Sequence, residues 1–108
     1  MAITVTPTLT RSETGTTLSW TISATSPHTS ASWVIVGPNN YRSRGTGNST
    51  SSRTETGNPG DAHSWYLRAD AYNSSLAENE YVDRLVSASV LGNGVYVYTS
   101  GAWKPLNF

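Results

Sequence analysis

Hydrophobic and polar residues alternate along this chain at intervals of two, most regularly between positions 57 and 73. A Pro-Gly turn at Pro59 opens this segment and Asn73 closes it. Successive side chains of a β-strand point to opposite faces, so the alternation predicts a strand with one buried and one wet face. The predicted inward face consists of Trp65, Leu67, Ala69 and Ala71, and the outward face of Tyr66, Arg68, Asp70 and Tyr72.

Two N-terminal segments show the same period. Residues 3–10 place Ile3 and Val5 on one face, and Pro7 predicts an edge strand or a break because proline cannot donate to a sheet ladder. Residues 17–23 alternate more cleanly and predict a strand. Its inward residues are Leu18, Trp20 and Ile22.

Two other segments predict strands of a different kind. Residues 32–36 are apolar on both faces, which predicts a central strand or one whose second face meets a partner. Residues 82–91 resume extended structure, with Leu85 facing away from the apolar positions. Val82, Arg84, Val86, Ala88 and Val90 share the other face.

The remaining stretches are polar. Residues 25–30 and 74–80 are predicted loops, and residues 41–52 show no apolar periodicity. Residues 53–56 predict a short polar strand before the Pro-Gly turn. No segment has a helical period, and about six to eight short strands with turns about every ten residues predict an all-β sandwich.

Composition narrows the classes of function. The chain has 108 residues, which fits one domain, and it has no cysteine, so neither a disulfide nor a thiol site is expected. Seven basic and seven acidic residues cancel, which argues against a nucleic-acid or anionic-membrane partner. No apolar run approaches the ~20 residues of a membrane-spanning helix. The first residues are typical of a strand and lack the features of a signal peptide.

Residues 4–90 resemble a fibronectin type III domain of the immunoglobulin-like class. The resemblance rests on Leu18-Ser19-Trp20 and on the Pro-Gly turn followed by the alternating strand that ends at Asn73. It implies an immunoglobulin/fibronectin III-like β-sandwich over residues 1–91. The family usually has a tyrosine where Trp65 stands. The spacing between Gly60 and Trp65 is also two residues longer than is usual in the family. An indole donates one hydrogen bond and accepts none, so this corner is expected to be built differently.

Residues 95–105 resemble a short motif of virion proteins of tailed bacteriophages. The motif has an aromatic-aliphatic strand, a glycine turn, and then Ala-Trp with a basic residue, here Trp103 and Lys104. It predicts a C-terminal β-hairpin within a second unit, residues 92–108. The resemblance implies a minor tail or capsid decoration protein, assembled in the host bacterial cytoplasm and carried in the virion.

Few residues invite a catalytic or metal-binding reading. Asp61, His63 and Ser64 crowd into four turn positions that cannot all converge as a catalytic triad, so turn chemistry is expected there. His28 lies far from His63 in the sequence, and the two with scattered carboxylates give no metal-ligand spacing. The expectation is therefore no enzyme, no metal and no cofactor.

Two interpretations of surface residues, single-strand binding and glycosylation, are not favoured. Arg42, Arg44 and Arg53 beside Tyr41 form a thin basic patch, and a solvated loop is favoured over single-strand binding. The chain contains two glycosylation sequons, and the second of them, at Asn73, is better explained as a strand end.

The aromatic residues divide into two groups. Trp20, Trp33 and Trp65 are expected in the core rather than on a carbohydrate platform. The predicted hairpin either folds back on its own domain or docks on a partner, because tyrosine and tryptophan dominate interface hot spots. The candidate partner-binding residues are Tyr96, Tyr98, Trp103 and Lys104.

These observations predict a non-enzymatic accessory protein of a tailed-phage virion. It would bind other virion proteins of the tail or capsid through edge strands and the hairpin, with self-association through virion symmetry as a further possibility. The alternative is a fibronectin III-like adhesion module that binds cell-surface glycans through Tyr41, Tyr66 or Tyr72 on exposed faces.

Overall fold

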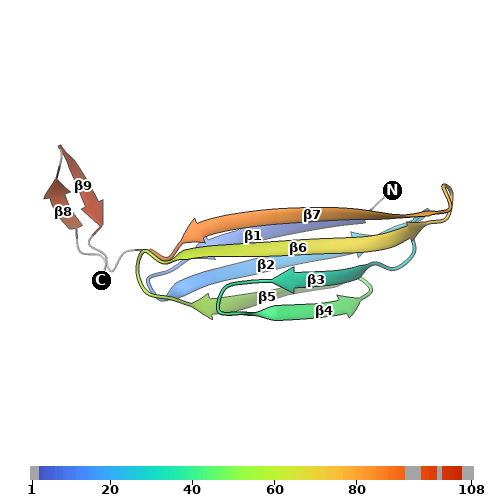
Figure 1. Cartoon of the computed structure of the whole chain (residues 1–108), viewed down its shortest axis with the longest axis horizontal. Helices are drawn as coiled ribbons and strands as arrows, with labels where there is room; N and C mark the ends of the chain where they lie inside the picture. The colour runs from blue at the N-terminus through green and yellow to red at the C-terminus, as the bar shows by residue number, and fades with distance from the viewer. Residues whose placement is uncertain (1–2, 92–95, 100, 106–108) are drawn as a thin grey trace.

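The computed structural model describes residues 3–91, 96–99 and 101–105, and side chains only up to Leu91 apart from Gly101. The described residues form antiparallel strands in three sheets and contain no helix (Figure 1). Two of the sheets face each other over one hydrophobic core, as a β-sandwich. The all-β prediction is therefore confirmed. No helix in the described part of the chain has the length and hydrophobicity to cross a membrane.

The first sheet has three strands in the order β1-β2-β5. They are β1 (Ile3–Arg11), β2 (Gly15–Ala24) and β5 (Ser49–Thr56). β1 is an edge strand, as Pro7 predicts, and β2 is central. The buried residues of this sheet include Leu18, Trp20 and Ile22, as the alternation predicts.

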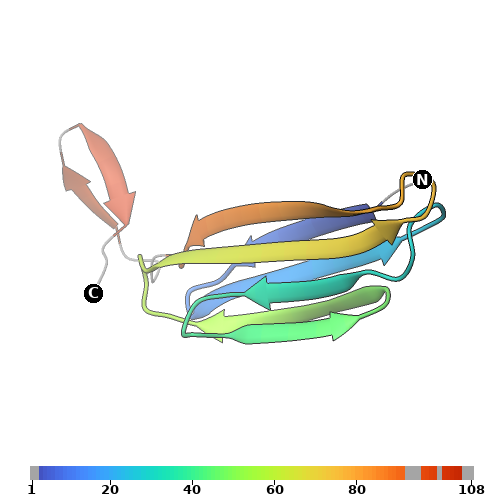
Figure 2. The ribbon, with the colours of Figure 1, turned by 45° about the vertical axis from the view of Figure 1, so that its right-hand side comes forward.

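The second sheet has four strands in the order β4-β3-β6-β7. They are β4 (Arg42–Thr46), β3 (Ser32–Val36), β6 (Ala62–Asn73) and β7 (Glu78–Ser89). The predicted inward residues of β6 are all buried, at 0 to 5% exposure. β7 contacts β1 of the first sheet, and the two strands lie side by side in both views (Figures 1 and 2).

The region between residues 41 and 56 differs from its prediction. It forms two strands, β4 and β5, which belong to different sheets, so the chain crosses the sandwich at Gly47. β4 has no apolar residue, but it pairs with β3, and Trp33 lies over Gly45. A Cβ on Gly45 would come within 2.6 Å of the Trp33 ring, so this strand depends on a glycine opposite a large side chain. β5 begins at Ser49 rather than at residue 53.

The turn between β6 and β7 is shorter than predicted. Residues 74–77 form it, with Ala77 at a positive φ of 54°, and β7 already begins at Glu78. The sandwich extends to Val90, which is buried, and Leu91, whose N–H donates to the Ser12 carbonyl.

The C-terminal hairpin consists of β8 (Tyr96–Thr99) and β9 (Ala102–Pro105). The two strands pair antiparallel around Gly101, which has a positive φ of 77°. They form a sheet of their own. The side chains of Tyr96, Tyr98, Trp103 and Lys104 lie outside the described part, so their proposed contacts stay predictions, as does the division at residue 92.

Candidate interaction surface

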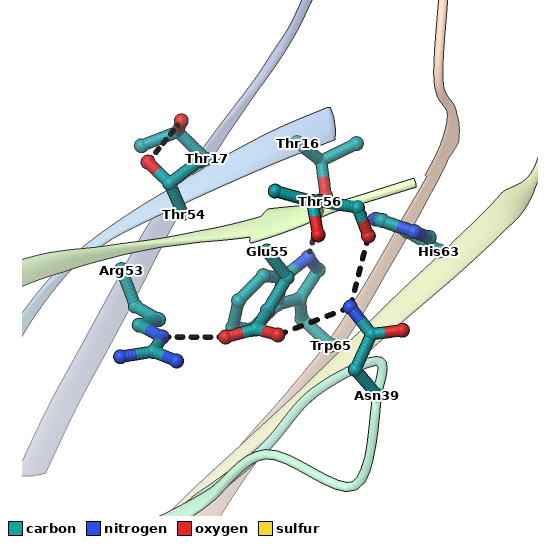
Figure 3. Close-up of polar contacts among 9 residues, drawn as sticks. All are labelled: Thr16, Thr17, Asn39, Arg53, Thr54, Glu55, Thr56, His63 and Trp65. Atoms are coloured by element: carbon teal, nitrogen blue, oxygen red, sulfur yellow. Dashed lines mark hydrogen bonds and ion pairs between the residues drawn. The ribbon is translucent and has the colours of Figure 1, made fainter. Parts of the chain in front are cut away.

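A buried chain of hydrogen bonds links β2 to β6 at the corner occupied by Trp65 (Figure 3). The Trp65 Nε1–H donates to Thr16 Oγ1 at 3.1 Å, and Thr16 Oγ1 lies 2.7 Å from His63 Nδ1. Since the Thr16 oxygen accepts from the indole, its own proton is free to donate to His63 Nδ1. These hydrogen bonds join the two sheets and give the polar atoms buried between them a partner. Neither burial was predicted, although Thr16 shares the parity of Leu18, and His63 that of Trp65, so the alternation could have indicated it.

The residues of the hypothetical triad do not converge. His63 points into the core at 3% exposure. Ser64 is exposed, and its hydroxyl lies 3.0 Å from that of Ser87 on β7. Asp61 accepts a hydrogen bond from the Asn58 backbone N–H at 2.8 Å and so closes the Pro-Gly turn. Turn and core chemistry therefore account for all three residues.

A second polar cluster ties the β3–β4 turn to β5 (Figure 3). Glu55, 7% exposed, accepts hydrogen bonds from Arg53 Nε at 2.5 Å and from Asn39 Nδ2 at 3.1 Å. Asn39 also donates to the Thr56 carbonyl. A positive φ of 59° at Asn39 makes this reach possible, and asparagine tolerates that conformation better than most residues.

The same cluster includes Tyr41. The Arg53 guanidinium lies 4.5 Å from the Tyr41 ring centroid, and the Tyr41 ring meets Trp65 edge-on at 5.9 Å. Tyr41 is packed against the core, so its predicted place on an exposed glycan-binding face is wrong. Arg53 is engaged by Glu55 and Tyr41, which removes it from the basic patch considered with Arg42 and Arg44.

The far end of β6 is held by a third cluster. His28 Nε2 lies 2.6 Å from Glu80 Oε1, which also accepts a hydrogen bond from Asn73 Nδ2 at 3.0 Å. The Asn73 and His28 hydrogen bonds lower the pKa of Glu80 below its ordinary value of 4.5. Asn73 Oδ1 accepts from the backbone N–H groups of Ser75 and Leu76. The side chain is buried, which confirms a strand-end role over a glycosylation site.

The three sandwich tryptophans occupy core positions to different degrees. Trp65 is fully buried, and Trp20 is 5% exposed with its Nε1–H donated to Ser49 Oγ. Trp33 is half-buried and packs against the core from its edge. Its buried Nε1 has no hydrogen-bond partner among the described residues.

The outer face of the three-stranded sheet carries hydroxyl groups almost exclusively, and we call it the hydroxyl face. Cross-strand pairs on it include Thr4 with Ser23 at 2.7 Å and Thr17 with Thr54 at 2.8 Å between side-chain oxygens. The strand registers place its members in rows across β1, β2 and β5. They are Thr4, Thr6, Thr8, Thr10, Thr17, Ser19, Thr21, Ser23, Thr50, Ser52 and Thr54.

The outer face of the four-stranded sheet has a different composition, and we call it the tyrosine–arginine face. Tyr72, Tyr81 and Leu85 on it are 42%, 56% and 68% exposed. The strand registers place Arg42, Val36, Tyr66 and Leu85 in one row and Arg44, Val34, Arg68 and Asp83 in the next. Its large or charged members are Val34, Val36, Arg42, Arg44, Tyr66, Arg68, Asp70, Tyr72, Tyr81, Asp83 and Leu85, and the same registers place Ser32, Thr46, Ser64, Asn79 and Ser87 among them.

Side chains on this face hold one another in place. Arg68 donates to both carboxylate oxygens of Asp70, and its guanidinium lies 3.9 Å from the Tyr81 ring centroid. The hydrogen bond to Asp70 raises the pKa of Arg68 above its ordinary value. Tyr66 Oη donates to Asp83 at 3.2 Å. Residues held by their neighbours lose less side-chain entropy on binding.

The sequence predicted part of this surface. Tyr66 and Arg68 were expected to face outward and Leu85 to lie on the opposite face from Val82 and Val86, and all three do. Tyr81 was not singled out, because its place beside Asp70 follows from the β6–β7 register rather than from a local pattern. No cluster of three or more metal-ligating side chains occurs within residues 3–91.

The structure thus presents one exposed face with tyrosines and arginines, residue types that are enriched at protein interfaces. Scans of the chain against family models, curated proteins and solved structures find no match.

Proposed function

We propose that this protein is a non-enzymatic structural component that attaches to a larger assembly by protein–protein contacts through the tyrosine–arginine face. The observation that carries the proposal is the difference between the two outer faces of one small sandwich. Tyrosine and arginine are enriched in interface hot spots, whereas serine and threonine are not. Leu85, exposed at 68%, would gain most from being covered.

The strand orders support a fibronectin III-like sandwich as the finer description of the fold. A three-stranded sheet β1-β2-β5 faces a four-stranded sheet β4-β3-β6-β7, with the crossing between sheets at Gly47. Such sandwiches recur as adhesive and structural modules, so the fold alone decides no function. The function rests on the composition of the exposed face.

The assembly we propose is the virion of a tailed bacteriophage. The support is the resemblance of residues 95–105 to a virion motif, and the backbone of β8 and β9 pairs as that strand-turn-strand pattern predicts. In this proposal the hairpin contributes a second contact through Tyr96, Tyr98, Trp103 and Lys104. The target of the hairpin is another virion protein of the tail or capsid.

The direct test is to locate the protein on purified particles of the phage that encodes it. We expect mass spectrometry to find the chain in the particles and immunogold labelling to place it on the tail or capsid. Tyr81→Ala on the tyrosine–arginine face, and Tyr98→Ala and Trp103→Ala on the hairpin, should each weaken binding of the full purified chain to particles that lack it. Thr8→Ala on the hydroxyl face is the matched control and should bind as the wild type does. Absence of the chain from the particles would contradict the proposal.

A glycan-binding module is the second candidate, and the exposure of Tyr72 favours it. An exposed tyrosine ring offers a flat surface on which a sugar stacks. Saturable binding of host surface polysaccharide that Tyr72→Ala abolishes and Thr8→Ala preserves, without particle binding, would establish this candidate instead.

A further inference from the structure

Charge on the tyrosine–arginine face is segregated between its two edges. Arg42 and Arg44 lie on β4 at one edge, and no ion pair of either occurs among the described residues. Asp83 lies on β7 at the other edge, where its only described side-chain contact is the Tyr66 hydroxyl. Arg44 and Asp83 stand at opposite ends of the same row. The face therefore carries Arg44 at one edge and Asp83 at the matching height of the other, where Arg84, of the opposite parity on β7, donates to the Asp83 backbone carbonyl and leaves its carboxylate unpaired by charge within the described part of the chain.

This arrangement is complementary to itself. A twofold axis that runs parallel to the strands, between β3 and β6, turns the face over and places β4 of one copy opposite β7 of the other. Position along the strands is preserved, so Arg44 meets Asp83 of the second copy twice, once on each side of the axis. Four strands spaced about 4.8 Å apart put these two contacts about 14 Å from each other.

The middle of the face suits the same packing. Val36 would meet Tyr66 of the second copy, and Val34 would meet Arg68. Arg68 already has Asp70 as its partner, so covering it leaves no unpaired charge. At the edges the aliphatic stem of Arg42 would cover Leu85, the most exposed large apolar residue of the sandwich. Facing sheets cross at about 30°, which shifts the edge contacts by about 4 Å, within reach of an arginine side chain.

We propose that the occupant of the tyrosine–arginine face is a second copy of this chain, paired by a twofold axis with reciprocal Arg44–Asp83 contacts. The inference rests on the proposed function and names one partner of the same surface. The outer face of one four-stranded sheet is small compared with most specific protein interfaces, so the dimer is weak in solution. It is strengthened where an assembly holds the copies close together.

The test uses the full chain in sedimentation equilibrium from about 1 μM to about 1 mM, the range that brackets weak dimers. We expect the wild type to dimerise, and Arg44→Asp and Asp83→Arg each to weaken the dimer at least about tenfold, because each brings like charges together twice. An equimolar mixture of these two variants should dimerise again. In the mixed pair, both edge contacts join an aspartate to an arginine.

Matched controls place the same charges on the other side of the molecule. Ser19→Asp and Thr21→Arg on the hydroxyl face should leave dimerisation unchanged. Leu85→Ser, which alters no charge and no buried residue, should weaken the dimer. Thermal melts of each variant confirm that it is folded.

A wild type that stays monomeric to about 1 mM would overturn the inference. A mixture that associates no better than its components, or hydroxyl-face variants that weaken the dimer equally, would also overturn it. The proposed function is tested separately, since a monomer that binds particles refutes only the second copy. A dimer found on no particle refutes only the virion proposal.

Discussion

The two outer faces of this sandwich differ more than its two inner faces do. Inside, each sheet contributes a buried tryptophan, Trp20 from the three-stranded sheet and Trp65 from the four-stranded one. Outside, one sheet presents rows of hydroxyl groups and the other presents tyrosine, arginine and aliphatic side chains. Both faces satisfy the alternation of a half-buried strand, so folding does not require the difference. The difference therefore points to interaction, and the following changes separate residues that hold the fold from residues that are free to serve a partner.

The largest expected effect concerns the shared core. Trp65→Ala and Trp20→Ala should each lower the free energy of unfolding by about 3–5 kcal/mol, a large part of the stability of a small domain. Trp65→Ala should be the worse of the two, because Trp65 is fully buried and its hydrogen bond to Thr16 is buried, whereas the Trp20 hydrogen bond to Ser49 is only partly buried. Chemical denaturation measures both values.

Trp33→Ala serves as the graded control, since Trp33 is only half-buried. Its loss should be the smallest of the three. Equal losses for all three would contradict the lower burial of Trp33.

The second expected effect compares adjacent threonines on β2. Thr16 is 1% exposed and stands between Trp65 and His63, so Thr16→Val leaves two buried polar atoms without a partner. We expect a loss of about 1–3 kcal/mol in the free energy of unfolding. Thr17→Val on the hydroxyl face should stay within about 0.5 kcal/mol of the wild type. A loss at Thr17 as large as that at Thr16 would show that the hydroxyl face holds the fold.

The third expected effect is a pH dependence of stability that arises from Glu80 on the four-stranded sheet. Because hydrogen bonds from Asn73 and His28 lower the pKa of Glu80 in the folded state, the carboxylate stabilises the fold above about pH 4.5. That contribution is lost as the pH falls through the lowered folded-state pKa. Glu80→Gln should therefore be less stable than the wild type at neutral pH and should approach it in acid.

The control for Glu80 is Glu78→Gln, which removes one carboxylate from the same strand without touching His28. Melting curves recorded between pH 7 and pH 3 should show the gap to the wild type closing in acid for Glu80→Gln only. A gap that stays constant with pH would contradict the role of the His28–Glu80 pair.

Local sequence patterns were enough to predict most strands of the sandwich. β6 and the centre of β2 follow a strict two-residue period, and Trp65 and Leu18 lie where that period puts them. β4 escaped prediction because its stability comes from pairing with β3 and from Gly45 accommodating Trp33, which are contacts distant in sequence. The corner residue Thr16 escaped for a related reason, since a threonine looks polar until its indole and imidazole partners are known.

The candidate surface was harder to predict from the sequence than the core. Alternation shows that Tyr66 and Arg68 face outward, but it does not show which residues of other strands lie beside them. The pairing of Arg44, Val34, Arg68 and Asp83 in one row depends on three strand registers. Register is set by the whole buried face and by the turns, so a property of the assembled sheet cannot be deduced from one strand.

The smallest expected effect is a coupling between side chains of the tyrosine–arginine face. Arg68 lies over the Tyr81 ring and is held by Asp70, an arrangement that keeps both residues ordered before a partner arrives. A double-mutant cycle with Arg68→Gln and Tyr81→Leu should give a favourable coupling in the free energy of unfolding, measured below the concentration at which chains associate. The matched cycle uses Thr17→Val and Thr54→Val on the hydroxyl face. The hydroxyl groups of these two threonines share one exposed hydrogen bond, which water replaces on unfolding, so its net contribution is small. We expect the first coupling to exceed the second, because the guanidinium and the ring attract each other even where water is present. Additive effects at Arg68 and Tyr81 would mean that this face is no more ordered than the hydroxyl face, and only its composition and its Arg44–Asp83 charge pattern would then favour it as the docking surface.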